Sequence, residues 1–234
     1  MYWINSKHIS TIHGFSTRHG GVSPAPFSSL NLGGTEDSAE NIAENRKRAL
    51  SDLNITMDQV SYLNQIHSNS VCQGKVGKQT GDALVTNQQG LALAVGAADC
   101  YPVLFHDEKN KVIGAAHCGW KGTLTRIVKN TIDEMVNLGA EKEQIKVAIG
   151  QGICAKNYEV SLEVIQQLRE QGFPEICWNG RQTDLLKANE FVALENGILK
   201  DNIWSMNRCT TESDFFSYRR DNGKTGRMWA VIMM

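Results

Sequence analysis

The chain has 234 residues and a mass of 25.9 kDa, enough for one large domain or two small ones. Hydrophobic residues make up 41% and charged residues 21%, proportions that exclude a disordered, collagen-like or coiled-coil protein. The formal net charge of −1 leaves no basic surplus for binding nucleic acid or an anionic membrane. No repeat or change of composition divides residues 1–234, which are predicted to form a single, monomeric domain.

The beginning of the chain and its cysteines favour a cytoplasmic protein. The first residues contain no basic segment followed by an apolar run, which a secretory signal would need. The longest apolar stretch, residues 91–98, is far shorter than the ~20 residues that span a bilayer. The 6 cysteines form no C-x-x-C pair and are expected to be reduced thiols.

The first distinctive segment is residues 15–34, which is rich in Gly, Pro and Ser. Loops of this length in a compact domain are usually functional or disordered. Phe15, Phe27, Leu30 and Leu32 supply apolar anchors, so an ordered loop is expected.

Hydrophobic periodicity then predicts the regular elements. Helices are expected at 39–53 after a Ser38 cap, at 123–138, at 162–171 between a Ser161 cap and Gly172, and at 184–196. Short runs rich in Val, Ile, Leu and Ala predict strands at 83–86, 91–96, 101–106, 111–117, 145–149 and 228–233. This irregular order favours an α+β fold or a layered α/β/α arrangement.

A predicted β-hairpin carries the residues with chemical potential. Residues 107–110 form a polar turn between two apolar runs. If the turn is symmetric about residues 108 and 109, Cys100 lies directly opposite His117, with Cβ atoms about 4.5–5.5 Å apart. The pair could share a Zn²⁺ ion, or the histidine could deprotonate a cysteine nucleophile. The plainer alternative is a cysteine packed as a small hydrophobe beside a hydrogen-bonded histidine.

A metal site would need a third ligand. His67 ends an apolar-flanked segment and is the natural candidate. His19, in the Gly-rich loop, is a further possibility, whereas His8, His13 and His106 lack such a setting.

Several separate motifs recur together in one known family. They are STRHGGVSP at 16–24, SLNLG at 29–33, NQIH at 64–67, ADCYP at 98–102, GAAHCGWKG at 114–122, IGQGIC at 149–154, YEV at 158–160 and FFSYRR at 215–220. On these motifs the chain resembles the laccase-domain family, also called the polyphenol oxidoreductase or peptidoglycan-editing-factor family, and its purine nucleoside phosphorylase type. The resemblance implies a single α/β/α-layered domain with a mixed sheet, related to bacterial cysteine-hydrolase toxins.

The resemblance also implies a metal centre and its ligands. Its His-Cys-His site carries over to His67, Cys100 and His117, which are expected to be both metal ligands and catalytic residues. Asp99, beside the cysteine, is our candidate for a proton shuttle, with a structural carboxylate as the alternative. Three protein ligands with an open position describe a catalytic zinc site, and such a site could also bind copper.

The same motifs imply contacts with substrate. A phosphate pocket would need cations, and the expected substrate-binding residues are Arg18, Asn31, Arg46, Lys121, Gln151 and Arg219. Two of them depart from the family pattern, since Arg is more common at position 121 and Pro at position 151.

The resemblance implies three alternative activities, each on a small-molecule substrate. The first is zinc-dependent phosphorolysis of adenosine, inosine and methylthioadenosine, with deamination of adenosine. The second is copper-dependent oxidation of phenols, which is disfavoured because 6 histidines without a His-x-His pair cannot supply both a blue-copper site and a three-copper cluster. The third is a metal-free cysteine amidase that cleaves mis-assembled UDP-muramoyl amino acids.

Overall fold

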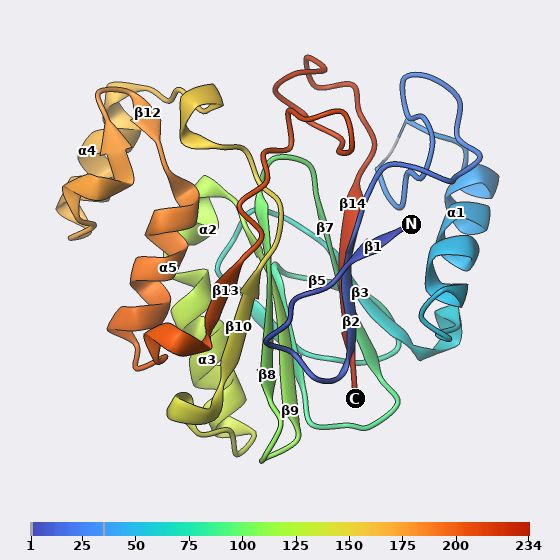
Figure 1. Cartoon of the computed structure of the whole chain (residues 1–234), viewed down its shortest axis with the longest axis horizontal. Coiled ribbons are helices and arrows are strands. Elements are labelled where there is room, and N and C mark those ends of the chain that lie inside the picture. Colours follow the sequence, from blue (N-terminus) through green and yellow to red (C-terminus); the bar gives the residue numbers. More distant parts are fainter. Residues whose placement is uncertain (1, 35) are drawn as a thin grey trace.

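The computed structural model describes residues 2–34 and 36–234 and contains two mixed β-sheets packed face to face between layers of helices (Figure 1). The first sheet has the order β1 (Trp3–Ile4), β2 (Ile12–Ser16), β14 (Met228–Met233), β7 (Ala92–Ala97), β3 (Val60–Asn64) and β5 (Gly77–Thr80). The second has the order β13 (Ile203–Ser205), β10 (Lys146–Ile149), β8 (Tyr101–Asp107), β9 (Val112–Cys118), β6 (Ala83–Thr86) and β4 (Val71–Gln73).

Helices cover the outer face of each sheet. Helix α1 (Ala39–Ser51) lies on the first sheet, at the right of Figure 1. The second sheet is covered on the other side by α2 (Trp120–Leu124), α3 (Ile127–Asn137) and α5 (Leu185–Glu195). The remaining elements are α4 (Leu162–Glu170), the hairpin of β11 (Trp178–Asn179) and β12 (Gln182–Thr183), and 3₁₀ turns at Met57–Gln59, Lys142–Gln144, Ala155–Asn157, Glu175–Cys177 and Lys200–Asn202. No helix in the described parts of the chain is both long and apolar enough to cross a bilayer.

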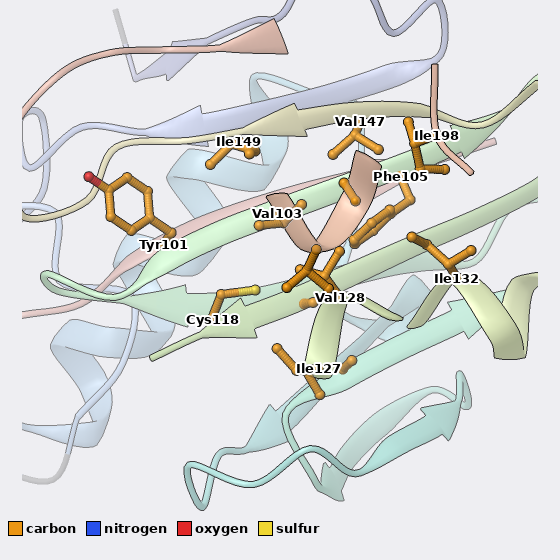
Figure 2. Close-up of a cluster of buried hydrophobic side chains, with 14 of the residues drawn as sticks. Tyr101, Val103, Phe105, Cys118, Ile127, Val128, Ile132, Val147, Ile149 and Ile198 are labelled. Atoms are coloured by element: carbon orange, nitrogen blue, oxygen red, sulfur yellow. The ribbon is translucent and has the colours of Figure 1, made fainter. Parts of the chain in front are cut away.

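The central strands of the second sheet, β8 and β9, are largely apolar on both faces because both faces are buried. In β8, Val103 and Phe105 pack toward α3, beside Ile132 (Figure 2). Leu104 points the opposite way, into the cluster between the two sheets. Continuous rather than alternating hydrophobicity is the expected pattern for a doubly covered sheet.

The structure corrects the expected layering. An α/β/α domain with one sheet was predicted, whereas the chain forms two sheets in an α/β/β/α order. All six predicted strands are present, as β6 to β10 and β14, with ends within one residue of those expected. In the two large sheets, the strands that were not predicted are β1, β2, β3 and β5 of the first and β4 and β13 of the second. They are short or contain the Gly and polar residues that obscure a strand pattern.

The predicted helix at 123–138 is in fact two helices. The chain turns at Arg126, which adopts a left-handed conformation with φ of 64° between α2 and α3. Its guanidinium lies 4.4 Å from the centre of the Phe173 ring and donates to the carbonyl of Gln171 at 2.8 Å. These tertiary contacts hold a break that helical periodicity does not reveal.

The other predicted helices and the N-terminal loop are confirmed. Ser38 caps α1 by accepting a hydrogen bond from the Asn41 amide. Ser161 stands at the start of α4 but makes no side-chain capping bond, and Gly172 follows that helix with a φ of 74°. The loop at 15–34 buries its anchors, which are Phe15, Phe27, Leu30 and Leu32.

Candidate metal centre

The candidate site lies where β8 begins and β9 ends, at the end of the hairpin opposite its turn. Asp107 pairs with Val112 across the turn, and Pro102 pairs with His117. The predicted register, with Cys100 directly opposite His117, is therefore wrong by two residues. The reason is that the loop between the last paired residues, Asp107 and Val112, contains four residues rather than the two that were predicted. Since an even shift keeps the side chain on the same face of the sheet, Cys100 and His117 are still diagonal neighbours.

Three side chains converge at this point. One ligand atom from each of His67, Cys100 and His117 can be chosen so that all three lie within 4.8 Å of one another. The two imidazole rings meet edge to face, with centroids 4.9 Å apart. His67 does not belong to the hairpin; it lies on the loop after β3 and has a φ of 57°.

The space between these ligands suits a metal ion. A Cβ at Gly119 would lie 3.0 Å from the Cys100 Sγ and 3.2 Å from the His67 Cδ2, so a larger residue would intrude on the ligands. Ligands of a tetrahedral zinc ion stand about 3.5 Å apart, given bond lengths of about 2.0–2.3 Å. Two nitrogens and one sulfur match the donors zinc prefers, and three protein ligands leave one position open.

Asp82 is a key residue that sequence reasoning missed. Its buried carboxylate accepts hydrogen bonds from the His117 Nδ1 at 3.0 Å and the His67 amide at 3.0 Å. It also accepts from the Ile66 amide and from the Ser68 amide and hydroxyl. Burial alone would raise the Asp82 pKa, but the bonds from His117 and Ser68 outweigh it and lower the pKa to about 2. One carboxylate therefore orients one histidine and fixes the backbone of the other.

The signal for Asp82 in the sequence is weak but definable. It is a single acidic residue directly before the fully buried strand β6, and a carboxylate buried there must be satisfied by hydrogen bonds.

Cys100 and His117 perturb each other's protonation. Although burial opposes both charges, the adjacent imidazolium lowers the Cys100 pKa to about 6. Against the same burial, the Cys100 thiolate and the hydrogen bond to Asp82 raise the His117 pKa to about 9. The opposite shifts favour the form of the metal-free pair in which a thiolate faces an imidazolium. The thiolate is the form of cysteine that binds metals and attacks electrophiles.

Asp99 is held by two donors just before β8, next to the candidate ligand Cys100. Its carboxylate accepts from the Thr210 hydroxyl and from the Arg219 amide, each at 2.6 Å. Its φ of 84° turns the chain immediately before Cys100. These contacts favour a positioning role for Asp99.

Lys121 is the predicted cation that borders an open cavity next to the metal ligands. The cavity has a volume of about 350 Å³ and is lined by His67, Ser68, Asn69, Trp120, Lys121, Leu124, Thr125 and Gln167. The Lys121 Nζ lies 5.6 Å from the centre of the Trp120 ring.

Two other residues that were predicted to bind substrate, Arg46 and Asn31, make contacts that stabilise the N-terminal loop. The Arg46 Nε donates to the Leu32 carbonyl at 2.8 Å, and its guanidinium lies 4.6 Å from the Trp229 ring centre. Asn31 is buried and donates to the Asp37 carboxylate at 2.9 Å. Both side chains therefore have structural partners of their own.

The remaining three also make intramolecular contacts. The Arg18 guanidinium lies 4.7 Å from the Phe216 ring centre, and that of Arg219 lies 5.1 Å from the Tyr158 ring centre. Gln151 is fully buried, and its Oε1 has no hydrogen-bond partner among the residues the structure describes.

The chain is similar to known proteins over almost its whole length. Residues 12–234 match the family described as multi-copper polyphenol oxidoreductase laccase. A purine nucleoside phosphorylase of Deinococcus radiodurans is 46% identical over 98% of this chain and 91% of its own length. An adenosine deaminase, RL5, from an unknown prokaryotic organism is 29% identical over 97% of this chain and 95% of its own.

Similarity extends to the three-dimensional structure. The crystal structure of YlmD from Geobacillus stearothermophilus matches with a TM-score of 0.95 at 30% identity, covering 100% of this chain and 96% of that one. By the length of the match in both sequence and structure, the chain belongs to the laccase-like polyphenol oxidoreductase family.

Proposed function

We propose that this chain is a zinc-dependent purine nucleoside phosphorylase that also deaminates adenosine. The observation that carries the proposal is the convergence of His67, Cys100 and His117 around a space that Gly119 keeps open. The names of its relatives supply the substrate class, purine nucleosides, and one of them names adenosine. Inosine and methylthioadenosine are the further substrates that the family resemblance implies.

Each residue then has a defined task. His67, Cys100 and His117 would hold the metal, and Asp82 would keep His117 in the tautomer whose Nε2 faces it. A zinc ion in such a site supplies Lewis-acid polarisation of a substrate oxygen. Lys121, in the adjoining cavity, is the best-placed cation for phosphate. Asp99, the proton shuttle expected from the sequence, would instead position Cys100, because its carboxylate is held by Thr210 and Arg219.

A copper-dependent phenol oxidase is the weaker proposal, in spite of the family's description. A single mononuclear centre cannot store the four electrons that reduce oxygen to water. Copper binds most nitrogen and sulfur sites more tightly than zinc, so adventitious copper would account for trace oxidation. Nucleoside turnover should therefore survive removal of copper and be indifferent to dissolved oxygen.

A metal-free cysteine amidase is the second candidate, because one observation favours it. Cys100, His117 and Asp82 are linked in the order of a nucleophile, a base and an orienting carboxylate. This agrees with the resemblance to cysteine-hydrolase toxins and with an amide substrate such as a UDP-muramoyl amino acid. His67 has no role in that triad, whereas it completes a metal site.

The decisive experiment incubates the zinc-loaded protein with adenosine, with and without phosphate, before and after chelation. Adenine and ribose 1-phosphate should form only when both phosphate and zinc are present. Adenine and free ribose formed in the absence of phosphate would indicate a hydrolase. Amidase activity that persists after chelation would establish the cysteine mechanism instead.

A matched pair of variants tests the ligands. Cys100→Ala should lose stoichiometric zinc, while Cys72→Ser, at a partly exposed thiol outside the site, should keep it. Full zinc retention by Cys100→Ala would overturn the assignment.

A further inference from the structure

Two further thiols, those of Cys154 and Cys209, lie close together and are separate from the candidate metal ligands. Gly152 forms a parallel bridge with Cys209, which brings the segment after β10 alongside the segment after β13. The Cys154 amide donates to the Cys209 Sγ at 3.1 Å. Because the amide nitrogen is about 1.46 Å from its own Cα, the Cys209 sulfur lies at most about 4.6 Å from the Cα of Cys154. That proximity is suitable for a disulfide.

A shared donor also gathers the two sulfurs. The Asn157 Nδ2 lies 3.3 Å from the Cys154 Sγ and 3.5 Å from the Cys209 Sγ. Thr211 adds a further contact, with its hydroxyl 3.2 Å from the Cys209 Sγ. Both sulfurs therefore sit around one polar side chain.

The two thiols differ in acidity. Burial would raise the Cys209 pKa, but hydrogen bonds from Cys154 and Thr211 outweigh it and leave the pKa below its ordinary value. Burial and the contact with Cys209 raise the Cys154 pKa to about 11. This asymmetry gives one sulfur the character of an attacking thiolate and the other that of a resolving thiol.

We propose that Cys154 and Cys209 are a redox-modification site that hydrogen peroxide converts reversibly into an intramolecular disulfide. The Cys209 sulfur attacks one peroxide oxygen, the O–O bond breaks, and a sulfenic acid and one water form. The Cys154 sulfur then attacks the sulfenic sulfur, the S–O bond breaks, and a second water leaves. Two thiols and one peroxide thus give one disulfide and two waters. Two equivalents of a small thiol such as glutathione reduce the protein disulfide back to two thiols and are themselves oxidised to glutathione disulfide.

This disulfide would cross-link the two segments that hold Asp99. The Ile153 amide, next to Cys154, donates to the Asp99 carbonyl at 2.8 Å. The Thr210 hydroxyl, next to Cys209, donates to the Asp99 carboxylate at 2.6 Å. Asp99 immediately precedes Cys100, so oxidation restrains the backbone that carries a metal ligand. The proposal does not depend on which reaction the metal centre catalyses.

Mass spectrometry of the zinc-loaded full chain tests the cross-link. After peroxide treatment, alkylation and non-reducing digestion, we expect one linked peptide pair containing Cys154 and Cys209, lighter by two hydrogens and released by dithiothreitol. Cys154→Ser and Cys209→Ser should each abolish it. Cys177→Ser, at a buried thiol in another core, should leave it intact. A different linkage, or a sulfinic acid at Cys209 without the linked pair, would overturn the proposal.

Hydrogen–deuterium exchange tests the consequence. In the oxidised protein, amides in residues 97–101 and 150–154 should exchange roughly threefold or more slowly, because cross-linking suppresses local opening. Peroxide-treated Cys154→Ser should show no such slowing. Unchanged exchange in the oxidised wild type would refute the link to Asp99.

Discussion

Replacement of Asp82 by Asn is the sharpest test of how the site is built. The carboxylate of Asp82 accepts from His117, from the His67 amide and from Ser68, so it supports two of the three proposed ligands at once. Asn keeps the size of the side chain but removes the charge. Its amide group also presents donors where the native environment already supplies donors.

The expected loss of stability follows from the ionisation of Asp82. Each tenfold change in proton affinity corresponds to about 1.4 kcal/mol, so lowering the pKa from 3.8 to about 2 favours the ionised folded state by about 2 kcal/mol. Unsatisfied donors cost about 1–3 kcal/mol more. We therefore expect the free energy of unfolding to fall by about 3–5 kcal/mol at neutral pH.

The expected loss of zinc affinity is separate from the loss of stability. Changes to the carboxylate behind a metal-binding histidine typically weaken metal binding by about 10- to 100-fold. Zinc affinity is measured by competition with a chromophoric chelator, and stability by urea denaturation of the metal-free protein.

Asp107→Asn is the matched control for this experiment. Asp107 is also buried, and it accepts from the Asn110 amide and side chain and from the Glu141 amide at the opposite end of the hairpin. Its replacement should lower stability but leave zinc affinity unchanged. Wild-type zinc affinity in Asp82→Asn, or an equal loss in Asp107→Asn, would refute the reasoning.

Three further predictions follow from the same contacts. Gly119→Ala should weaken zinc binding about tenfold or more, because the added Cβ would lie 3.0 Å from the Cys100 sulfur. The control is Gly33→Ala, whose added Cβ would have no neighbour closer than 3.8 Å and which should bind zinc normally in the same competition assay. In metal-free protein, alkylation of Cys100 by iodoacetamide should have its midpoint near pH 6, and His117→Ala should move it upward; an unmoved midpoint would contradict the ion pair. Burial would raise the Asp107 pKa, but hydrogen bonds from Asn110 and Glu141 outweigh it and lower the pKa. The ionised carboxylate therefore contributes its full stabilisation above its ordinary pKa and loses it as pH falls through the lower pKa of the folded state. The urea midpoints of wild type and Asp107→Asn should accordingly converge between about pH 5 and pH 2. A constant difference across that range would contradict it.

The hairpin that carries Cys100 and His117 illustrates how far local patterns reach. The apolar runs and the polar turn predicted both strands correctly, but not where the turn closes, because Lys111 adopts a φ of 55° that extends the loop. The resulting error was an even number of residues, and strand side chains alternate with a period of two. The prediction that Cys100 and His117 lie on the same face of the sheet was therefore correct, although their predicted register was wrong.

The sequence by itself determined the family, the six central strands, most of the helices and the three proposed ligands, because these depend on local periodicity and on motifs that lie within short segments. The tertiary structure alone decided that two sheets stack, that the chain breaks at Arg126, and that Asp82 supports both histidines. Pairing between strands such as β2 and β14 joins residues more than 200 positions apart, and its specificity comes from backbone hydrogen bonds and burial of opposing faces. A buried carboxylate acquires its role in the same way, from donors that only the folded chain brings around it.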